Sequence, residues 1–248
     1  MHIQQGEMVM FKNEFIRTIA GSAIALLAFT QPSYAINSDL TLYLWGADIS
    51  GTATLGSQTI PQQPVDVDFD DILDKLDFGI QLHYEGVGEN WGGGLDYTYI
   101  KLSDTNDAGV KGEVKSTLTE LFALYRANQA VDVLAGVRFL GLDMSVTGPN
   151  ELANADGERD LTDVFAGGRA RLPISDSVLF IMRGDIGTGD SDLVWNALLG
   201  IDWHVSNSIA LRGGYRWLDY DLDKDDASVE EKLDISMSGP FLGVGFQW

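Results

Sequence analysis

Polar and apolar residues alternate with a period of two through most of the chain after residue 35. In the clearest segment one face carries Phe78, Ile80, Leu82 and Tyr84. The other face carries Asp77, Gly79, Gln81, His83 and Glu85. Successive side chains of a β-strand point to opposite faces, so this pattern predicts a strand with one apolar and one polar face. Because no segment after residue 35 has a long apolar run or a helical period, the sequence predicts an all-β protein.

Two further segments alternate in the same way with a few exceptions. Leu134 interrupts the polar face of residues 131–139, and Val194 and Leu198 interrupt that of residues 193–204. Counting such segments gives ten expected strands, which start near residues 39, 76, 91, 114, 130, 160, 177, 192, 208 and 233. Eight strands are the alternative, if two weak segments such as the fourth do not pair.

The connections between these strands alternate in length. Short links are expected at residues 88–90, 127–129, 175–177 and 206–208. Mostly longer ones are expected at residues 52–75, 104–113, 147–159, 187–191 and 222–232, with a short helix from Asp71 to Leu76. Outer-membrane barrels have short periplasmic turns and longer outer loops. The pattern therefore predicts a transmembrane antiparallel up-and-down β-barrel with the longer connections outside.

The strands of a soluble lipocalin-like barrel also alternate apolar and polar residues, so alternation does not show whether the barrel lies in water or in a membrane. The residues near the strand ends are the evidence that distinguishes the two. Aromatic residues expected on the apolar faces, many near strand ends, are Tyr43, Trp45, Trp91, Tyr97, Tyr99, Trp195, Trp203, Tyr215 and Trp217. Such residues form interfacial girdles in membrane barrels. The last segment alternates and ends on Trp248, which resembles the signal read by barrel-assembly machinery. We therefore expect that machinery to be a partner through the C-terminal strand.

The first 35 residues have the three regions of a secretory signal peptide. Lys12 and Arg17 supply positive charge, residues 18–30 are mostly apolar, and Ser33 and Ala35 place small residues at the expected cleavage site. A membrane-spanning helix needs about 20 apolar residues, which this run does not reach. We expect cleavage before Ile36 and a single barrel domain over residues 36–248, and the true translation start stays open.

Composition excludes several classes of function. The net charge of −21 argues against a nucleic-acid partner, and the absence of cysteine excludes disulfides and thiolate metal sites. Residues 219–230 place acids at the offsets of a calcium loop, but Lys224 stands where that loop needs glycine. We expect no cofactor and no dedicated metal site, and at most loose binding of divalent cations by acidic outer loops.

Arginines and acidic residues are expected to point into the lumen. Seven of the nine arginines lie on strands at lumen or rim positions: Arg126, Arg138, Arg169, Arg171, Arg183, Arg212 and Arg216. Their expected partners are Asp96, Glu120, Asp132, Asp163, Asp185 and Asp202. In a barrel of eight to ten strands side chains can fill the interior, so the interpretation is a narrow or plugged lumen held by ion pairs. The alternative is a porin-like channel for small solutes or ions that uses the same arginines.

An enzyme is the less favoured interpretation. Histidine is the usual general base near neutral pH, and only His83 and His204 follow the expected signal peptide. Both fall on lumen faces of distant strands, and no motif marks a nucleophile beside either. The sequence therefore favours a non-enzymatic role over an outer-membrane protease or lipid-modifying enzyme.

Two stretches, Tyr43–Gly56 and Val65–Ser103, carry a family resemblance. They resemble the amino-terminal half of a poorly characterised family of outer-membrane β-barrels, loosely grouped with porin-like and opacity-type barrels. The resemblance implies a bacterial outer-membrane location, with outer-membrane lipids and lipopolysaccharide as surroundings, and a structural or surface-interacting role. That family has no well-defined catalytic motif, so the resemblance carries over no functional residue.

Overall fold

The computed structural model describes residues 36–54, 63–67, 69–74, 76–105, 109–148, 154–226 and 229–248. The predicted signal peptide, residues 1–35, lies outside the described residues. The elements are β1 (Asn37–Trp45), β2 (Asp48–Thr54), β3 (Gln63–Val67), α2 (Phe69–Asp74), β4 (Leu76–Val87), β5 (Trp91–Thr105), β6 (Lys111–Arg126), β7 (Val131–Thr147), β8 (Asn154–Ser175), β9 (Val178–Gly189), β10 (Leu193–His204), β11 (Ile209–Asp226) and β12 (Val229–Gln247). In the described part of the chain, no helix is both long and apolar enough to cross a membrane.

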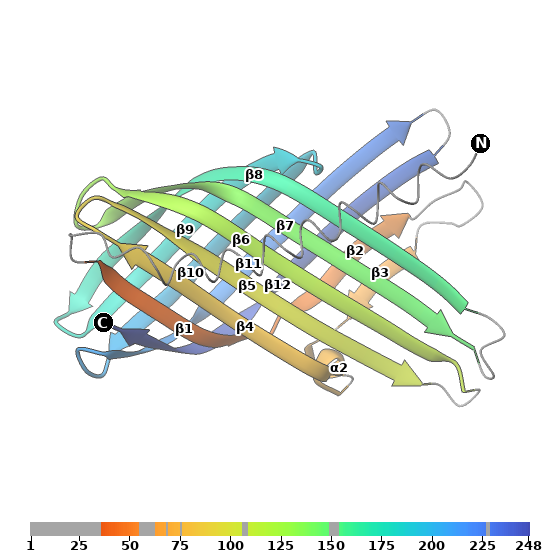
Figure 1. Ribbon diagram of the computed structural model, residues 1–248, viewed down its shortest axis with the longest axis horizontal. Helices are drawn as coiled ribbons and strands as arrows, with labels where there is room; N and C mark the ends of the chain where they lie inside the picture. The colour runs from red at the N-terminus through yellow and green to blue at the C-terminus, as the bar shows by residue number, and fades with distance from the viewer. Residues whose placement is uncertain are drawn as a thin grey trace. The chain divides into compact units, whose positions relative to one another are not determined.

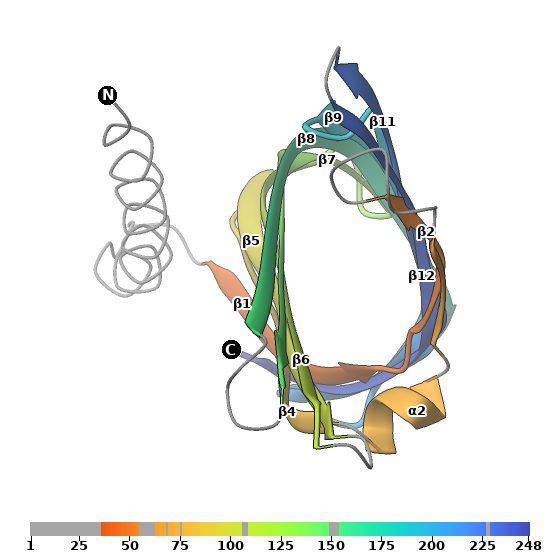
Figure 2. The same cartoon turned by 90° about the vertical axis from the view of Figure 1, so that its right-hand side faces the viewer.

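Ten strands, β1 and β4 to β12, close into an antiparallel barrel (Figures 1 and 2). Each strand from β4 to β12 pairs with its neighbours in chain order, and β1 closes the ring because it pairs with both β4 and β12. This arrangement confirms the predicted up-and-down barrel. It also decides between the two strand counts in favour of ten.

The short strands β2 and β3 extend one side of the barrel beyond β1. β12 pairs with β1 through residues 241–247 and with β2 through residues 232–238, and β3 adds to the edge of β2. The region predicted as a first outer loop thus contains two strands and a helix. That helix spans Phe69–Asp74 rather than the predicted Asp71–Leu76.

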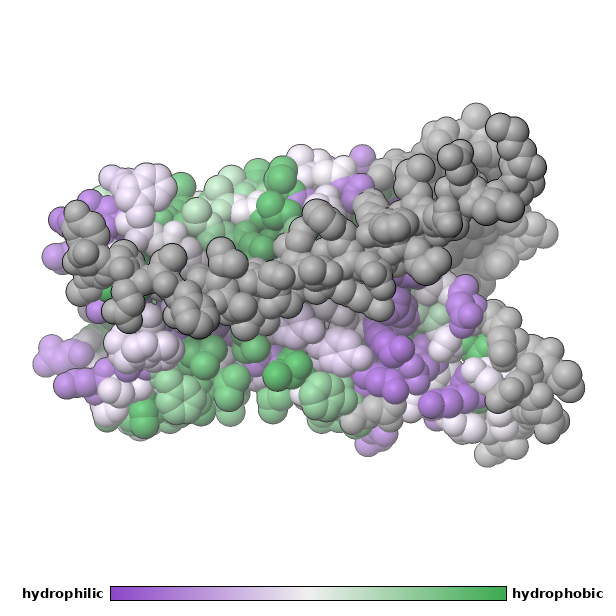
Figure 3. All heavy atoms as spheres, viewed as in Figure 1, coloured by the Kyte–Doolittle hydropathy of each residue, from purple (hydrophilic) through white to green (hydrophobic). Residues whose placement is uncertain are grey.

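Strand register sets which residues face lipid and which face the lumen. The apolar face predicted for β4 points outward, while Gln81 and Glu85 are buried inside. Figure 3 shows apolar residues gathered over the middle of the visible face and hydrophilic ones towards both ends. The exceptions to alternation point inward with the polar residues, since Leu134 is 2% and Val194 0% exposed. The lumen is therefore partly apolar.

Two aromatic residues predicted on the apolar face lie inside the barrel. Leu44 on β1 is 71% exposed and Trp45 is 6% exposed, and Tyr43 hydrogen-bonds to a lumen carboxylate. The lipid-facing positions of β1 are taken by Leu40, Leu42 and Leu44 at a period of two, so the alternate positions must turn inward.

The strands are longer at the outer end than the sequence predicted. Within the expected loops 104–113, 147–159 and 222–232, residues 104–105, 111–113, 147, 154–159, 222–226 and 229–232 are paired strand, and β8 spans 22 residues. Backbone pairing continues without apolar alternation because its hydrogen bonds need no apolar face. In the acidic segment 219–230, residues 219–226 and 229–230 therefore lie on the paired strands β11 and β12, with Asp225 as the backbone register partner of Glu230. The predicted short connections are confirmed at the opposite end, where β4 and β5, β6 and β7, β8 and β9, and β10 and β11 are joined.

Candidate functional site

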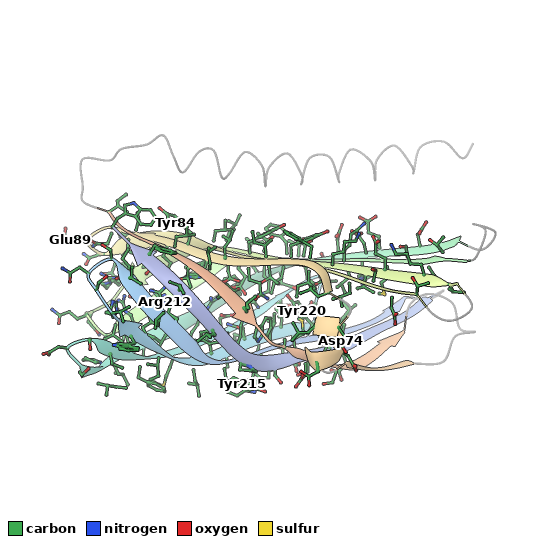
Figure 4. All side chains as sticks on the ribbon, turned by 90° about the horizontal axis from the view of Figure 1, so that it is seen from below. Asp74, Tyr84, Glu89, Arg212, Tyr215 and Tyr220 are labelled. Carbon is green, nitrogen blue, oxygen red and sulfur yellow. The ribbon has the colours of Figure 1, made fainter. Side chains whose placement is uncertain are left out.

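The turn end of the barrel is the end that carries the short connections 88–90, 127–130, 176–177 and 205–208. In outer-membrane barrels this end faces the periplasm. From the turn end outward, the lumen contains an open vestibule, a layer of ion pairs and an apolar layer. Figure 4 shows Arg212 inside the barrel towards the turn end and Tyr220 further along towards the outer end.

Glu120 on β6 is the centre of the ion-pair layer. Its carboxylate accepts hydrogen bonds from Arg138 Nε at 3.0 Å, Arg183 Nη2 at 2.7 Å and Arg216 Nη2 at 2.6 Å. Arg138 is the register partner of Glu120 on the neighbouring strand β7, whereas Arg183 on β9 and Arg216 on β11 reach Glu120 across the lumen. Both Glu120 and Arg138 are 0% exposed. Charge-assisted bonds of this length are among the stronger hydrogen bonds in proteins.

Asp185 and Asp96 complete the central cluster. Asp185 accepts from Arg138 Nη2 at 2.7 Å and from Arg183 Nε at 3.0 Å. Asp96 accepts from Arg216 Nη1 at 3.4 Å and from the Tyr43 hydroxyl at 2.8 Å. The layer therefore balances three guanidiniums with three carboxylates. A neutral side chain links them, because Asn196 accepts from Arg216 and donates to Asp185 at 2.9 Å each.

Aromatic rings cover the guanidiniums of this layer. Arg138 lies over the Phe165 ring at 4.8 Å, and Arg216 lies over the Trp45 ring at 4.9 Å. Arg183 lies 5.5 Å from the Phe122 ring. Cations at these distances are attracted by the ring faces, so the packing holds the guanidiniums flat across the lumen.

A second cluster surrounds Asp132 at the turn end. Arg169 donates to Asp132 Oδ2 at 2.8 Å, and Arg171 donates to Asp132 Oδ1 at 3.0 Å. Arg169 also reaches across the lumen to Glu85, with bonds of 2.5 and 3.0 Å to its two oxygens. Arg126 Nε lies 3.6 Å from Asp132 Oδ1.

A third cluster, around Arg212, lies on the other side of the vestibule. Arg212 donates two bonds to Asp39, at 2.6 and 2.5 Å, and one to Asp202 at 3.2 Å. Gln247 donates to the same Asp39 at 2.9 Å.

Asp163 differs from the expectation that it would pair with an arginine. It accepts bonds from the Ser191 backbone nitrogen at 2.8 Å and from the Ser191 hydroxyl at 3.0 Å. Asp163 lies on β8 opposite Gly189 at the end of β9, and its bonds to Ser191 therefore hold the turn between β9 and β10 at the outer end.

His83 is held on both sides of its ring. Its Nδ1 lies 3.0 Å from Asp96 Oδ2, and its Nε2 lies 3.1 Å from Glu85 Oε1. Both nitrogens are therefore occupied by carboxylates. His204 lines the vestibule at the turn end.

The apolar layer lies directly outward of the ion pairs. It comprises Trp45, Leu118, Leu140, Leu161, Val194, Leu218, Tyr220, Leu222 and Ile235, all buried and in one cluster. Leu118, Leu140 and Leu218 each stand two positions beyond a residue of the charged layer on the same strand. They therefore point into the same lumen, one level further out.

The vestibule is a cavity of about 510 Å³ at the turn end. Its lining includes Arg126, Arg169, Arg171, Arg212 and Trp248. Its polar lining includes members of all three clusters, with Asp96 and Arg183 of the central cluster at its inner boundary. Its apolar groups include Leu179, Ile181, Leu198 and Phe241.

A further charged cluster lies on the outward surface at the outer end, beyond the apolar band. Glu113 pairs with Lys101 and Lys115 at 3.1 Å each. Hydrogen bonds from these two lysines lower the pKa of Glu113 to about 2. In the described ranges, no group of three or more His, Cys, Asp or Glu side chains is arranged to hold a metal ion.

Sequence reasoning missed four members of the lumen network: Asp39, Tyr43, Glu85 and Asn196. Glu85 was on the predicted polar face, and its alternation with His83 was the available signal. The faces of strands are visible in the sequence, whereas the partner across the lumen is not.

No family model matches the chain, and the comparison with curated proteins finds no relative. The solved structure of the outer-membrane protease OmpT from Escherichia coli is similar with a TM-score of 0.53 and 7% identity, over 88% of this chain and 99% of that one. The translocator domain of the autotransporter NalP from Neisseria meningitidis has a TM-score of 0.46 and 13% identity, covering 98% of both chains. Ail, the attachment invasion locus protein of Yersinia pestis, has a TM-score of 0.41 and 11% identity, over 86% of this chain and 98% of that one.

At such identities the likeness bears on fold alone. The ten-stranded closed barrel and its lipid-facing apolar surface agree with it. The chain therefore has the fold of an outer-membrane β-barrel.

Proposed function

We propose that this protein is a non-enzymatic outer-membrane barrel with a structural or surface-interacting role, and that its lumen is closed to ions and solutes. The observation that supports this proposal is the series of two layers across the lumen. In the first layer the guanidiniums are paired with carboxylates of the neighbouring strand and of strands across the lumen. In the second, buried apolar side chains fill the space immediately outward. A conducting path needs continuous water, and apolar constrictions oppose it.

The bonds of His83 support the non-enzymatic part of the proposal. A general base needs a ring nitrogen that can reach the proton of a substrate or water. Both nitrogens of His83 already contact Asp96 and Glu85. This histidine therefore acts as a cross-link in the lumen network.

The long outer ends of the strands support a surface-interacting role. A tilted strand needs about 9 to 11 residues to cross a membrane, and β8 has 22. The outward residues at this end include Lys101, Glu113 and Lys115. The barrel therefore presents a charged rim above the lipid.

A small-solute channel is the second candidate, and the vestibule is the observation that favours it. The vestibule has a volume of about 510 Å³ and is open to solutes at the turn end. Conduction would require both layers to move aside.

Thiol accessibility tests whether the lumen is closed. Because the chain has no cysteine, Leu140→Cys in the apolar layer and Leu198→Cys in the vestibule each give one reactive group. We expect a charged, water-soluble thiosulfonate to label Leu198→Cys rapidly and Leu140→Cys at least tenfold more slowly in the folded, detergent-solubilised barrel. Equal labelling rates, with both variants still folded by their electrophoretic mobility, would contradict the closed lumen and promote the channel.

A further inference from the structure

The vestibule is a built cavity whose size suits a small ligand. Its volume of about 510 Å³ lies within the range of small-molecule sites, which is about 300 to 1,000 Å³. It is bounded outward by the ion-pair layer and opens at the turn end, which faces the periplasm. Any ligand would thus enter from the periplasm, whether or not the lumen conducts.

The two sides of the vestibule carry different charge. On one side, Arg126, Arg169 and Arg171 surround the carboxylate of Asp132, and Arg169 also reaches Glu85 of β4 across the lumen. On the other side, a single guanidinium meets two carboxylates in the third cluster. The arginine-rich side is built on β6, β7 and β8, whereas the acid-rich side is built on β10, β11 and β1, which lie across the ring. The excess positive charge is therefore local to the first side.

The arginine-rich side also has hydrogen-bond donors without acceptors. Nε of Arg126 and Nε of Arg171 are buried and bond to no acceptor. Asp132 is already engaged at both oxygens by Arg169 and Arg171, and Arg126 lies 3.6 Å away. Buried donors left without a partner are unfavourable. Both residues line the vestibule, so an anion there would add an acceptor beside their guanidiniums.

An apolar strip adjoins these arginines. Ile181 on β9 is the register partner of Arg171 on β8, and Leu179 is the partner of Pro173. Ile181 and Leu179 both line the cavity. Neighbouring positions on paired strands lie about 5 Å apart, so an anionic group at the guanidiniums would place its own apolar part on this strip.

We propose that the vestibule is a periplasmic binding site for a small organic carboxylate. The carboxylate is held by Arg126 and Arg171, and the apolar body packs against Ile181 and Leu179. Guanidiniums present paired donors that match the two oxygens of a carboxylate, and the adjoining strip selects against anions that are polar throughout.

Benzoate is a suitable probe, because benzamide is its neutral counterpart of the same shape and inorganic phosphate is an anion without an apolar body. Binding to the purified, folded barrel is measured by saturation-transfer NMR and by isothermal titration. We expect benzoate to bind more tightly than either comparison compound. Equal binding of benzamide would show that charge is not recognised, and equal binding of phosphate would show that the apolar strip is not used; either result overturns the proposal.

Variants locate the site. Loss of a charge-assisted hydrogen bond weakens binding about tenfold, so Arg171→Gln and Arg126→Gln should each weaken benzoate by about that factor. Ile181→Ser should weaken benzoate and leave phosphate unchanged. Lys115→Gln removes a positive charge at the opposite end of the barrel and should change neither. If the two arginine variants fold and bind benzoate as the wild type does, the site is elsewhere and the proposal is wrong.

Discussion

Glu120 holds three guanidiniums from three different strands, so its removal should be the most damaging single change in the lumen. In Glu120→Ala, Arg138 and Arg183 keep Asp185, and Arg216 keeps Asp96 and Asn196. One negative charge is nevertheless lost among three buried positive charges. Breaking a buried pair costs about 3 to 5 kcal/mol. We expect the free energy of unfolding of Glu120→Ala to fall by about that amount, and less if water enters the space.

Urea unfolding in lipid vesicles, followed by tryptophan fluorescence, measures this change. Glu120→Gln keeps the shape and removes the charge, so it separates electrostatics from packing and should lose most of the same stability. Glu113→Gln is the matched control, because Glu113 also pairs with lysines but at the exposed outer end, where such pairs are weak. A Glu120→Gln barrel as stable as the wild type, or no less stable than Glu113→Gln, would refute the reasoning.

Three further results are expected. Leu199→Arg places a charge on the lipid face and should lower unfolding free energy by about 2 to 4 kcal/mol near the bilayer midplane; wild-type stability in vesicles would show that this face does not meet lipid. The pKa of Glu113 should be about 2 by carbon NMR titration. Because the pKa is depressed on folding, the stabilisation is present above the ordinary pKa of about 4.5 and is lost as pH falls towards 2; an unshifted titration would contradict the lysine pairing. Gly239→Ala should destabilise the barrel by about 1 to 3 kcal/mol, because a Cβ there would lie 1.8 Å from the Gly46 carbonyl oxygen. Gly184→Ala has no atom within 4 Å of the added Cβ and should be neutral, so equal losses in the two variants would rule out this clash.

The inward and outward faces of the strands could be predicted from alternation because a period of two is a local property of the backbone. The faces of β4 were predicted in this way. The same reasoning failed at Tyr43 and Trp45, where aromatic character was taken as a sign of lipid contact. Their parity with Thr41, a buried polar residue, indicates the lumen face.

The contacts across the lumen could not be predicted in the same way. Arg216 and Glu120 are 96 positions apart and meet at 2.6 Å, because closure of the ring brings β11 opposite β6. That meeting depends on strand tilt and register, which alternation does not fix. The apolar residues of the lumen were missed for a related reason. Val194 of the apolar layer, and Leu134 of a separate cluster with Phe122 and Leu124, were interpreted as exceptions on polar faces, whereas both are buried in the lumen.

Conductance of the wild-type barrel in a planar lipid bilayer tests the closed lumen most directly. Insertion is established independently by counting fluorescently labelled barrels in the same membrane. We expect no steady current from inserted protein, because both the layer of ion pairs and the apolar layer next to it block the lumen. Steady single-channel currents whose anion preference changes in Arg183→Ala, with the unfolding midpoint unchanged, would contradict it.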